Sequence, residues 1–230
     1  MGSYIEESNN RIKSKFFSKN SASYIFDDVI VFVKDSLPEE IDLKLILQKI
    51  EKYVPEQIGR MIDSIMIGDF PQLDRDPPIL AFYENGSLFV SNNPPDHKSM
   101  FRAIIHEMAH AIEESHGLDI YADGLLENEF LRKRIQLKNK LKDYEIPTKL
   151  GIKSFMNPEY SSDFDNFLYD IGYDKLSKLM NGMFINPYSA TSLREYFASG
   201  FEECCAGDKR YLKNTSPVLY DKIMLFVRQN

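Results

Sequence analysis

Cysteine is scarce in this chain, and none of its apolar runs is long. The 230 residues include two cysteines, which are adjacent at positions 204 and 205. A disulfide between neighbouring residues would be strained and would join no distant segments, so we expect free thiols and a reducing compartment. Apolar runs such as VIVFV at 29–33 fall far short of the ~20 residues that a transmembrane helix needs. We therefore expect no membrane-spanning segment.

Positive charge is also in deficit. The chain has 28 basic and 35 acidic residues, which gives a net charge of -7. Because a negative field repels nucleic-acid phosphates and anionic membrane surfaces, we expect neither as a partner. The start, MGSYIEESNNRIKSK, has no apolar signal segment, and Glu6 stands where a myristoylation signal has Ser or Thr. These features favour a cytoplasmic protein.

The residue patterns change in character along the chain. Residues 1–20 are polar and unpatterned, which predicts a flexible arm. β-branched and aromatic residues predict strands over 24–35 and 62–70, with a helix over 38–54 between them. Asn85-Gly86 between two apolar segments predicts a β-hairpin over 79–91. Helical periodicity then covers 98–115, 120–143, 162–180, 190–206 and 216–229.

These elements predict an α+β fold in a single domain over residues 21–230. A small mixed sheet and the first long helix would form an N-terminal lobe over 21–117, and helices would form a C-terminal lobe over 118–230. The basic cluster LRKRIQLKNKLK at 131–142 alternates with apolar residues at helical spacing. This spacing predicts charges that face mainly solvent rather than a binding patch.

The stretch HEMAH at 106–110 carries the most specific chemical pattern. On a helix, His106 and His110 lie on one face, about 40° and one turn apart, so both rings can reach one Zn²⁺. Glu107 stands beside them, where its carboxylate can contact a water without coordinating the metal. The alternative is a pair of core histidines beside a coincidental glutamate. We interpret the stretch as a zinc site, with Glu107 as the general base.

A catalytic zinc site needs a third protein ligand and an open position. His116 has the spacing of the third ligand in HExxHxxGxxH metzincins, but Glu113 replaces the glycine that lets the chain return to the metal. A helix that continues through Glu114 would carry His116 away, toward a helix C-terminus. Glu113 itself lies too far along the helix axis to share the ion. We expect Glu113 either to contact a metal-binding residue without binding the ion itself or to face solvent.

The segment NPYSATSLREYFASGFEECCAG at 186–207 supplies the other candidate ligand. Together with HEMAH, it resembles the gluzincin metallopeptidases of the anthrax lethal factor-like type, in which a helix with the motif E-[FY]-F-A-x-x-F follows the HExxH helix. The resemblance implies a zincin-like metallopeptidase fold and a third zinc ligand at Glu195. It also implies that Tyr188, seven residues before Glu195, faces the substrate carbonyl.

Two local features of this segment leave alternatives open. Ser192-Leu193-Arg194-Glu195 also spells a capping box, in which the glutamate only bonds the amide of the capping residue. The family often has an acid four residues after the ligand glutamate, where this chain has Ser199. Support for a zinc histidine would then come from Ser199, a backbone carbonyl, Glu113 or Glu202.

The sequence as a whole predicts a zinc-dependent metalloendopeptidase, a hydrolase with one Zn²⁺ per chain that acts on a peptide or protein substrate. The remaining segments resemble small peptidase-like proteins of tailed-phage genomes, which implies a phage-encoded protein or a component of a larger particle. Two alternatives stay open. One is an inactive relative in which zinc only stabilises a structural or interaction module, and the other is a metzincin-like protease that uses His116.

Overall fold

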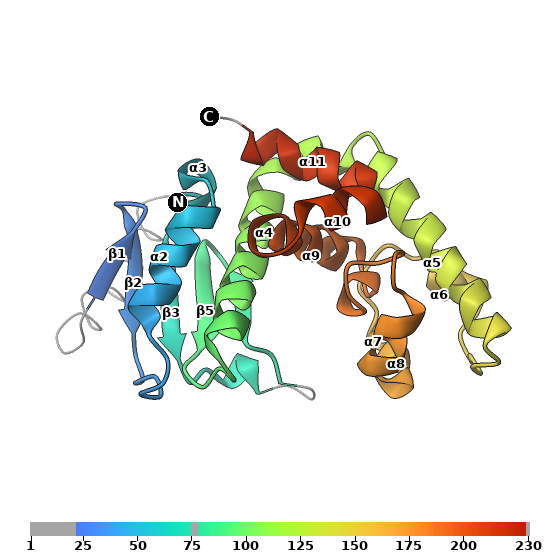
Figure 1. Cartoon of the computed structure of the whole chain (residues 1–230), viewed down its shortest axis with the longest axis horizontal. Coiled ribbons are helices and arrows are strands. Elements are labelled where there is room, and N and C mark those ends of the chain that lie inside the picture. Colours follow the sequence, from blue (N-terminus) through green and yellow to red (C-terminus); the bar gives the residue numbers. More distant parts are fainter. Residues whose placement is uncertain (1–21, 75–77, 229–230) are drawn as a thin grey trace, which may run out of the picture. The chain divides into compact units, whose positions relative to one another are not determined.

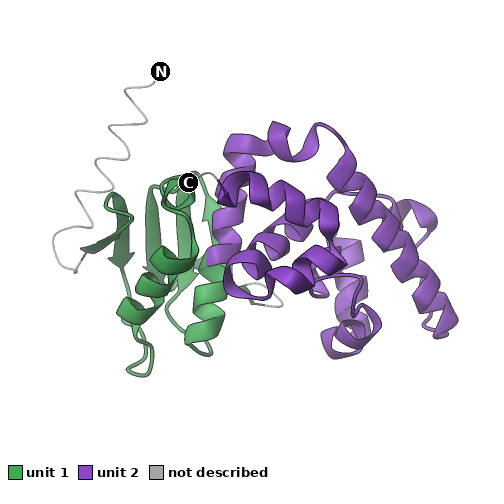
Figure 2. Ribbon diagram, turned by 45° about the horizontal axis from the view of Figure 1, so that its top comes forward, with its two compact units in different colours: residues 1–104 green, residues 105–230 purple. Residues whose placement is uncertain are grey.

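The computed structural model describes residues 22–74 and 78–228. This part of the chain is α+β, with one small mixed sheet followed by a helical C-terminal region, which confirms the predicted class (Figure 1). The chain forms two compact units, Met1–Ile104 and Ile105–Asn230, which Figure 2 colours separately. Their boundary falls inside helix α4 (His97–Tyr121). The arm predicted for residues 1–20 lies outside the described residues.

The sheet of the first unit has the strand order β1-β2-β3-β5-β4. The central strands β2, β3 and β5 are parallel, and the edge strands β1 and β4 are antiparallel to their neighbours. The strands are β1 (Ala22–Ile25), β2 (Val29–Val33), β3 (Ser64–Gly68), β4 (Ala81–Glu84) and β5 (Ser87–Ser91).

The single strand predicted over 24–35 is wrong, because the chain turns between β1 and β2. Phe26 and Asp27 have positive φ angles of 49° and 64°, a conformation that is uncommon for a bulky residue. The Phe26 side chain is 5% exposed and lies so close to Gly59 that a Cβ there would be 2.3 Å from the ring. Burial of the ring against Gly59 therefore accompanies a turn that the apolar pattern does not reveal.

The predicted hairpin is confirmed. Asn85 and Gly86 have φ angles of 48° and 78° between β4 and β5, as a type I′ turn requires at both central positions. The predicted helix over 38–54 is shorter, because the Asp42 side chain caps helix α2 (Leu43–Tyr53) by accepting from Leu45 N. The short helices α3 (Glu56–Gly59) and η1 (Pro71–Leu73) complete this unit's described secondary structure before α4.

The second unit is helical. The helix predicted over 162–180 is two helices, since Gly172 with a φ of 91° separates them. The helix predicted from residue 190 begins at Leu193, where Ser192 caps it, and it is preceded by a 3₁₀ turn. The elements that follow α4 are α5 (Leu125–Asp143), α6 (Ile152–Phe155), α7 (Ser162–Ile171), α8 (Tyr173–Leu179), η2 (Tyr188–Ala190), α9 (Leu193–Ala206), α10 (Lys209–Thr215) and α11 (Pro217–Val227).

Eight of the 14 residues of helix α9 are buried, and the helix packs against α5, α10 and α11. A Cβ on Gly200 would lie 2.4 Å from Cδ2 of Leu219, so the close approach of α9 and α11 needs glycine at this position. Cys204 and Cys205 are buried, free thiols on the same helix. None of the helices in the described ranges has both the length and the apolar character needed to cross a membrane.

Two residues of the basic cluster are exceptions to the prediction that its charges face mainly solvent. Lys133 and Arg134 are 7% and 1% exposed. The ammonium of Lys133 donates to Tyr196 Oη at 2.5 Å and to Ser216 Oγ at 2.6 Å. The guanidinium of Arg134 lies 3.5 Å from the ring centroid of Phe164. Both cations are buried because polar or aromatic groups from other helices surround them, which the charge pattern of one helix cannot show.

Candidate metal centre

Helix α4 presents the histidines of the HEMAH stretch within the second unit. Its fully buried residues Ile105, Met108, Ala109 and Ile112 set the rotation of the helix. His106 and His110 are one turn apart, with side chains 12% and 10% exposed. Because four residues make slightly more than one helical turn, both rings lie on the same face.

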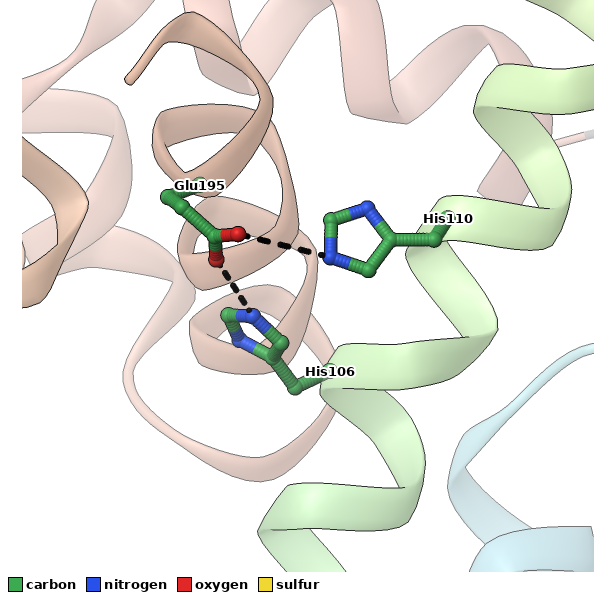
Figure 3. A group of neighbouring side chains, drawn as sticks. All are labelled: His106, His110 and Glu195. Carbon is green, nitrogen blue, oxygen red and sulfur yellow. Dashed lines mark hydrogen bonds and ion pairs between the residues drawn. The ribbon is translucent and has the colours of Figure 1, made fainter. Parts of the chain in front are cut away.

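Helix α9 brings the carboxylate of Glu195 to these rings, and the three side chains point toward one another (Figure 3). Glu195 Oε2 lies 2.9 Å from His106 Nε2, and Glu195 Oε1 lies 3.8 Å from His110 Nε2. One ligand atom from each residue falls within 4.8 Å of the others. Tetrahedral zinc with nitrogen and oxygen ligands separates them by about 3.3 Å. These three residues could therefore hold a metal ion after small adjustments.

Of the two hydrogen bonds of a capping box, the described residues show the one that the backbone amide of Glu195 donates. Ser192 Oγ accepts a hydrogen bond from Glu195 N at 3.1 Å, so the serine caps α9. The glutamate carboxylate reaches His106 and His110 on the other helix. The backbone amide of Glu195 thus belongs to the cap, whereas its side chain belongs to the candidate metal centre.

His106 lies between two carboxylates of α9. Its Nδ1 is 3.2 Å from Glu202 Oε2, and its Nε2 contacts Glu195. Burial lowers the pKa of His106, but hydrogen bonds to Glu195 and Glu202 and the charges of Glu195 and Glu107 outweigh burial and raise it to about 10. The pKa of Glu195 is lowered, because interactions with His106 outweigh its burial. Without a metal, His106 is therefore a cation, and a metal would replace the proton on Nε2.

A carboxylate also contacts the outer nitrogen of His110, which is Nδ1, the ring nitrogen other than the one near Glu195. Nδ1 of His110 lies 2.5 Å from Glu113 Oε2. The other oxygen of Glu113 accepts from the Tyr121 hydroxyl, and Arg194 Nε lies 3.5 Å from Oε2. A proton on Nδ1 donated to Glu113 leaves Nε2 of His110 with a lone pair for a metal.

Glu113 and Glu202 thus contact the outer nitrogens, two of the possibilities that the sequence leaves open. Ser199 Oγ is buried and has no hydrogen-bond partner in the described parts of the chain. The sequence contains a signal for Glu202, since it stands seven residues after Glu195 and therefore on the same helix face. No comparable signal identifies Tyr121, whose position depends on how α4 continues after its kink.

Tyr188 also lies at this centre, and the charge of Glu107 acts on it. The ring centroid of Tyr188 is 6.1 Å from that of His106. Burial raises the pKa of Tyr188, and the charges of Glu195, Asp165 and Glu107 raise it further. The tyrosine therefore keeps its proton and can donate a hydrogen bond. The influence of Glu107 on both His106 and Tyr188 means that its carboxylate lies within the electrostatic reach of the site.

His116 does not join the cluster. It is the residue of α4 with non-helical angles, φ -131° and ψ 23°, so the helix is kinked there before it continues to Tyr121. The ring packs against Phe226 with a centroid distance of 5.3 Å. Its Nδ1 is buried and has no hydrogen-bond partner within the described residues. The group with metal-binding geometry found there consists of His106, His110 and Glu195.

Comparison of the chain with protein-family models, with curated proteins and with solved structures gives no significant match. The class of site is therefore defined by its own chemistry. Two imidazole nitrogens and one carboxylate converge from two helices, and each imidazole has a carboxylate at its outer nitrogen. This arrangement is a candidate metal centre.

Proposed function

We propose that the protein is a zinc-dependent endopeptidase with a zincin-like catalytic domain of the gluzincin type. The observation that carries this proposal is the convergence of His106, His110 and Glu195 from α4 and α9. Two histidines and one glutamate form a recurrent ligand set of catalytic zinc, and three protein ligands leave a position open for water or substrate. A site that served only to stabilise the fold would more often have four protein ligands.

A zinc ion bound there would act as a Lewis acid and lower the pKa of a ligated water toward neutrality. Glu107 accepts the proton of the attacking water and returns it to the leaving amine. Its position directly after His106 supports this function, since its charge acts on His106 although Glu107 is not one of the three grouped residues. The Tyr188 hydroxyl donates to the carbonyl oxygen of the substrate as negative charge develops. The raised pKa of Tyr188 supports its role as a donor.

Metal content and peptide hydrolysis test this proposal together. Protein purified without chelators in zinc-replete medium should contain one zinc per chain, measured by plasma mass spectrometry. Glu107→Gln should keep the zinc and reduce hydrolysis of a quenched fluorogenic peptide library by at least about a hundredfold. Glu114→Gln, an exposed position on the same helix, is the matched control and should keep both properties.

The possible outcomes distinguish the alternatives. Absence of bound zinc would contradict the proposal. Zinc binding without hydrolysis of any library by the unaltered protein would favour the non-catalytic, zinc-stabilised module instead. Hydrolysis that survives in Glu107→Gln would show that another group accepts the proton.

A further inference from the structure

The two carboxylate oxygens of Glu113 have different partners. Its side chain is 5% exposed, and Oε2 lies 2.5 Å from Nδ1 of His110. Oε1 accepts a hydrogen bond from the hydroxyl of Tyr121. The last torsion of a glutamate has no sharp rotamer preference, so the carboxylate can turn when nothing holds it. The bond from Tyr121 holds one oxygen and thereby fixes the direction in which the other oxygen faces His110.

Tyr121 reaches Glu113 across the kink in α4. The two residues are eight apart in the chain, which in a straight helix is about 12 Å along the axis and 80° around it. Side chains three or four apart meet on a helix surface, whereas side chains eight apart are not neighbours there. The kink lies between them at His116, with φ -131° and ψ 23°. The contact therefore depends on the kink rather than on regular helix geometry.

Helices α9 and α11 fix the segment that carries Tyr121. The ring of Tyr121 lies edge-on to that of Phe197 on α9, with a centroid distance of 6.3 Å. Lys222 Nζ on α11 donates to Asp119 O and to Asp123 Oδ2, both at 2.8 Å. Asp119 and Asp123 stand two residues before and two residues after Tyr121. Packing and hydrogen bonds outside the three grouped residues thus hold the tyrosine beside Glu113.

Arg194 also contacts Glu113 and His110, but more weakly. Its side chain is 61% exposed, and its Nε lies 3.5 Å from Glu113 Oε2, so solvent screens the pair. Its Nη2 is 3.4 Å from Nδ1 of His110, whereas Glu113 Oε2 is 2.5 Å from the same nitrogen. The shorter contact favours a proton on Nδ1 that points to Glu113. Tyr121 is therefore the firmer constraint on the carboxylate that accepts this proton.

We propose that Tyr121 is a positioning residue of the metal centre. Its hydroxyl holds Glu113 so that Oε2 accepts the Nδ1 proton of His110, and Nε2 of the same ring then keeps its lone pair for the metal. This inference rests on the zinc site of the proposed function and adds the residue that orients one of its ligands.

Zinc affinity, measured by competition with a chromophoric chelator, tests the assignment. Tyr121→Phe removes only the hydroxyl and should weaken zinc binding about tenfold, the lower end of the loss expected for groups around the ligands. Tyr211→Phe is the matched control, because it removes a half-buried hydroxyl that donates to Phe184 O at 3.4 Å, outside the cluster. The control should leave affinity unchanged. Circular dichroism checks the folding of each variant.

A double-mutant cycle distinguishes positioning from general support of the fold. In a Glu113→Ala background the hydroxyl has no carboxylate to hold, so the addition of Tyr121→Phe should weaken zinc binding by less than about twofold. The visible absorption spectrum of Co²⁺-loaded protein, which reports the ligand geometry, should change in Tyr121→Phe and stay the same in Tyr211→Phe.

The outcomes separate this inference from the proposed function. Unchanged zinc affinity in Tyr121→Phe, an equal loss in both backgrounds or an unchanged Co²⁺ spectrum would overturn the positioning role and leave the peptidase function standing. Zinc binding by the unaltered protein without peptide hydrolysis would contradict the peptidase function alone, since the affinities still decide about Tyr121. Absence of zinc binding by the unaltered protein would contradict both.

Discussion

The carboxylate of Glu195 lies 2.9 Å from Nε2 of His106, although 89 residues separate them in the chain. The contact is made by two helices whose rotations are fixed independently, by buried apolar residues on α4 and by the Ser192 cap and buried face of α9. A metal ion that binds this pair together with His110 would cross-link the two helices. Metal binding and the stability of the second unit should therefore be coupled.

The ligand set predicts that substitutions of Glu195 and His116 differ in their effect on zinc affinity. Glu195→Ala removes a donor from the cluster, so its zinc affinity should fall by more than the roughly 10–100-fold typical of changes around the ligands. His116→Ala should change the affinity little, because the ring packs on Phe226 outside the cluster. Competition with a chromophoric chelator measures both, with folding checked by circular dichroism. Loss of zinc in His116→Ala with retention in Glu195→Ala would indicate a metzincin-like site.

Substitution of Glu113 or Glu202, whose carboxylates contact the outer histidine nitrogens, should lower zinc affinity less than substitution of Glu195. Glu202→Gln and Glu113→Gln should each lower zinc affinity about 10–100-fold, because each removes the charge that orients a histidine ring. Ser199→Ala is the matched control on α9, since its hydroxyl has no hydrogen-bond partner in the described residues. It should leave affinity unchanged. An equal loss in Ser199→Ala would mean that the serine, rather than Glu202, supports the site.

The fold class could be read from the sequence because its signals are local. Asn85-Gly86 requires a turn at that position, and helical periodicity marks the C-terminal region. The turn at Phe26 was not predicted, because it depends on the contact of its ring with Gly59, which is distant in sequence. For the same reason, the burial of Lys133 could not be predicted from α5 alone, since its partners Tyr196 and Ser216 belong to other elements.

The candidate site could be predicted to a similar extent. The spacing of His106 and His110 places both on one helix face without any tertiary information. Glu195 required the resemblance to a family, because nothing in its local sequence distinguishes a ligand from the last residue of a capping box.

The pKa of His106 predicts how pH changes the stability of the metal-free protein. Its folded value of about 10 lies above the model-peptide value of 6.5, so its contribution is complete below pH 6.5 and is lost as pH rises through 10. Between pH 6.5 and 8, the free energy of unfolding should fall by up to about 1.4 kcal/mol per pH unit. Urea denaturation with a chelator measures this slope, which His106→Gln should flatten. A slope that persists in His106→Gln would assign it to another group.

A buried hydrogen-bond network links α5, α9 and α11, and its disruption should lower the stability of the protein strongly. The carboxylate of Glu129 is buried and accepts from Tyr196 Oη at 2.8 Å and from the amides of Val218 and Leu219 at 3.0 and 3.2 Å at the start of α11. Lys133 donates to the same tyrosine hydroxyl. Glu129→Ala leaves these three donors without their acceptor and removes the negative charge that acts on the buried Lys133 ammonium, so the free energy of unfolding should fall by about 3–5 kcal/mol.

Lys133→Met tests whether the buried charges act as a unit. Each single variant leaves one charge uncompensated, whereas the double variant Glu129→Ala/Lys133→Met removes both, so its loss should be smaller than the sum of the single losses. Arg132→Met, at the adjacent exposed position, should change stability by less than about 0.5 kcal/mol. Urea denaturation of the four variants gives the coupling free energy. Additive losses would mean that Glu129 serves α11 and Tyr196 independently of the charge on Lys133.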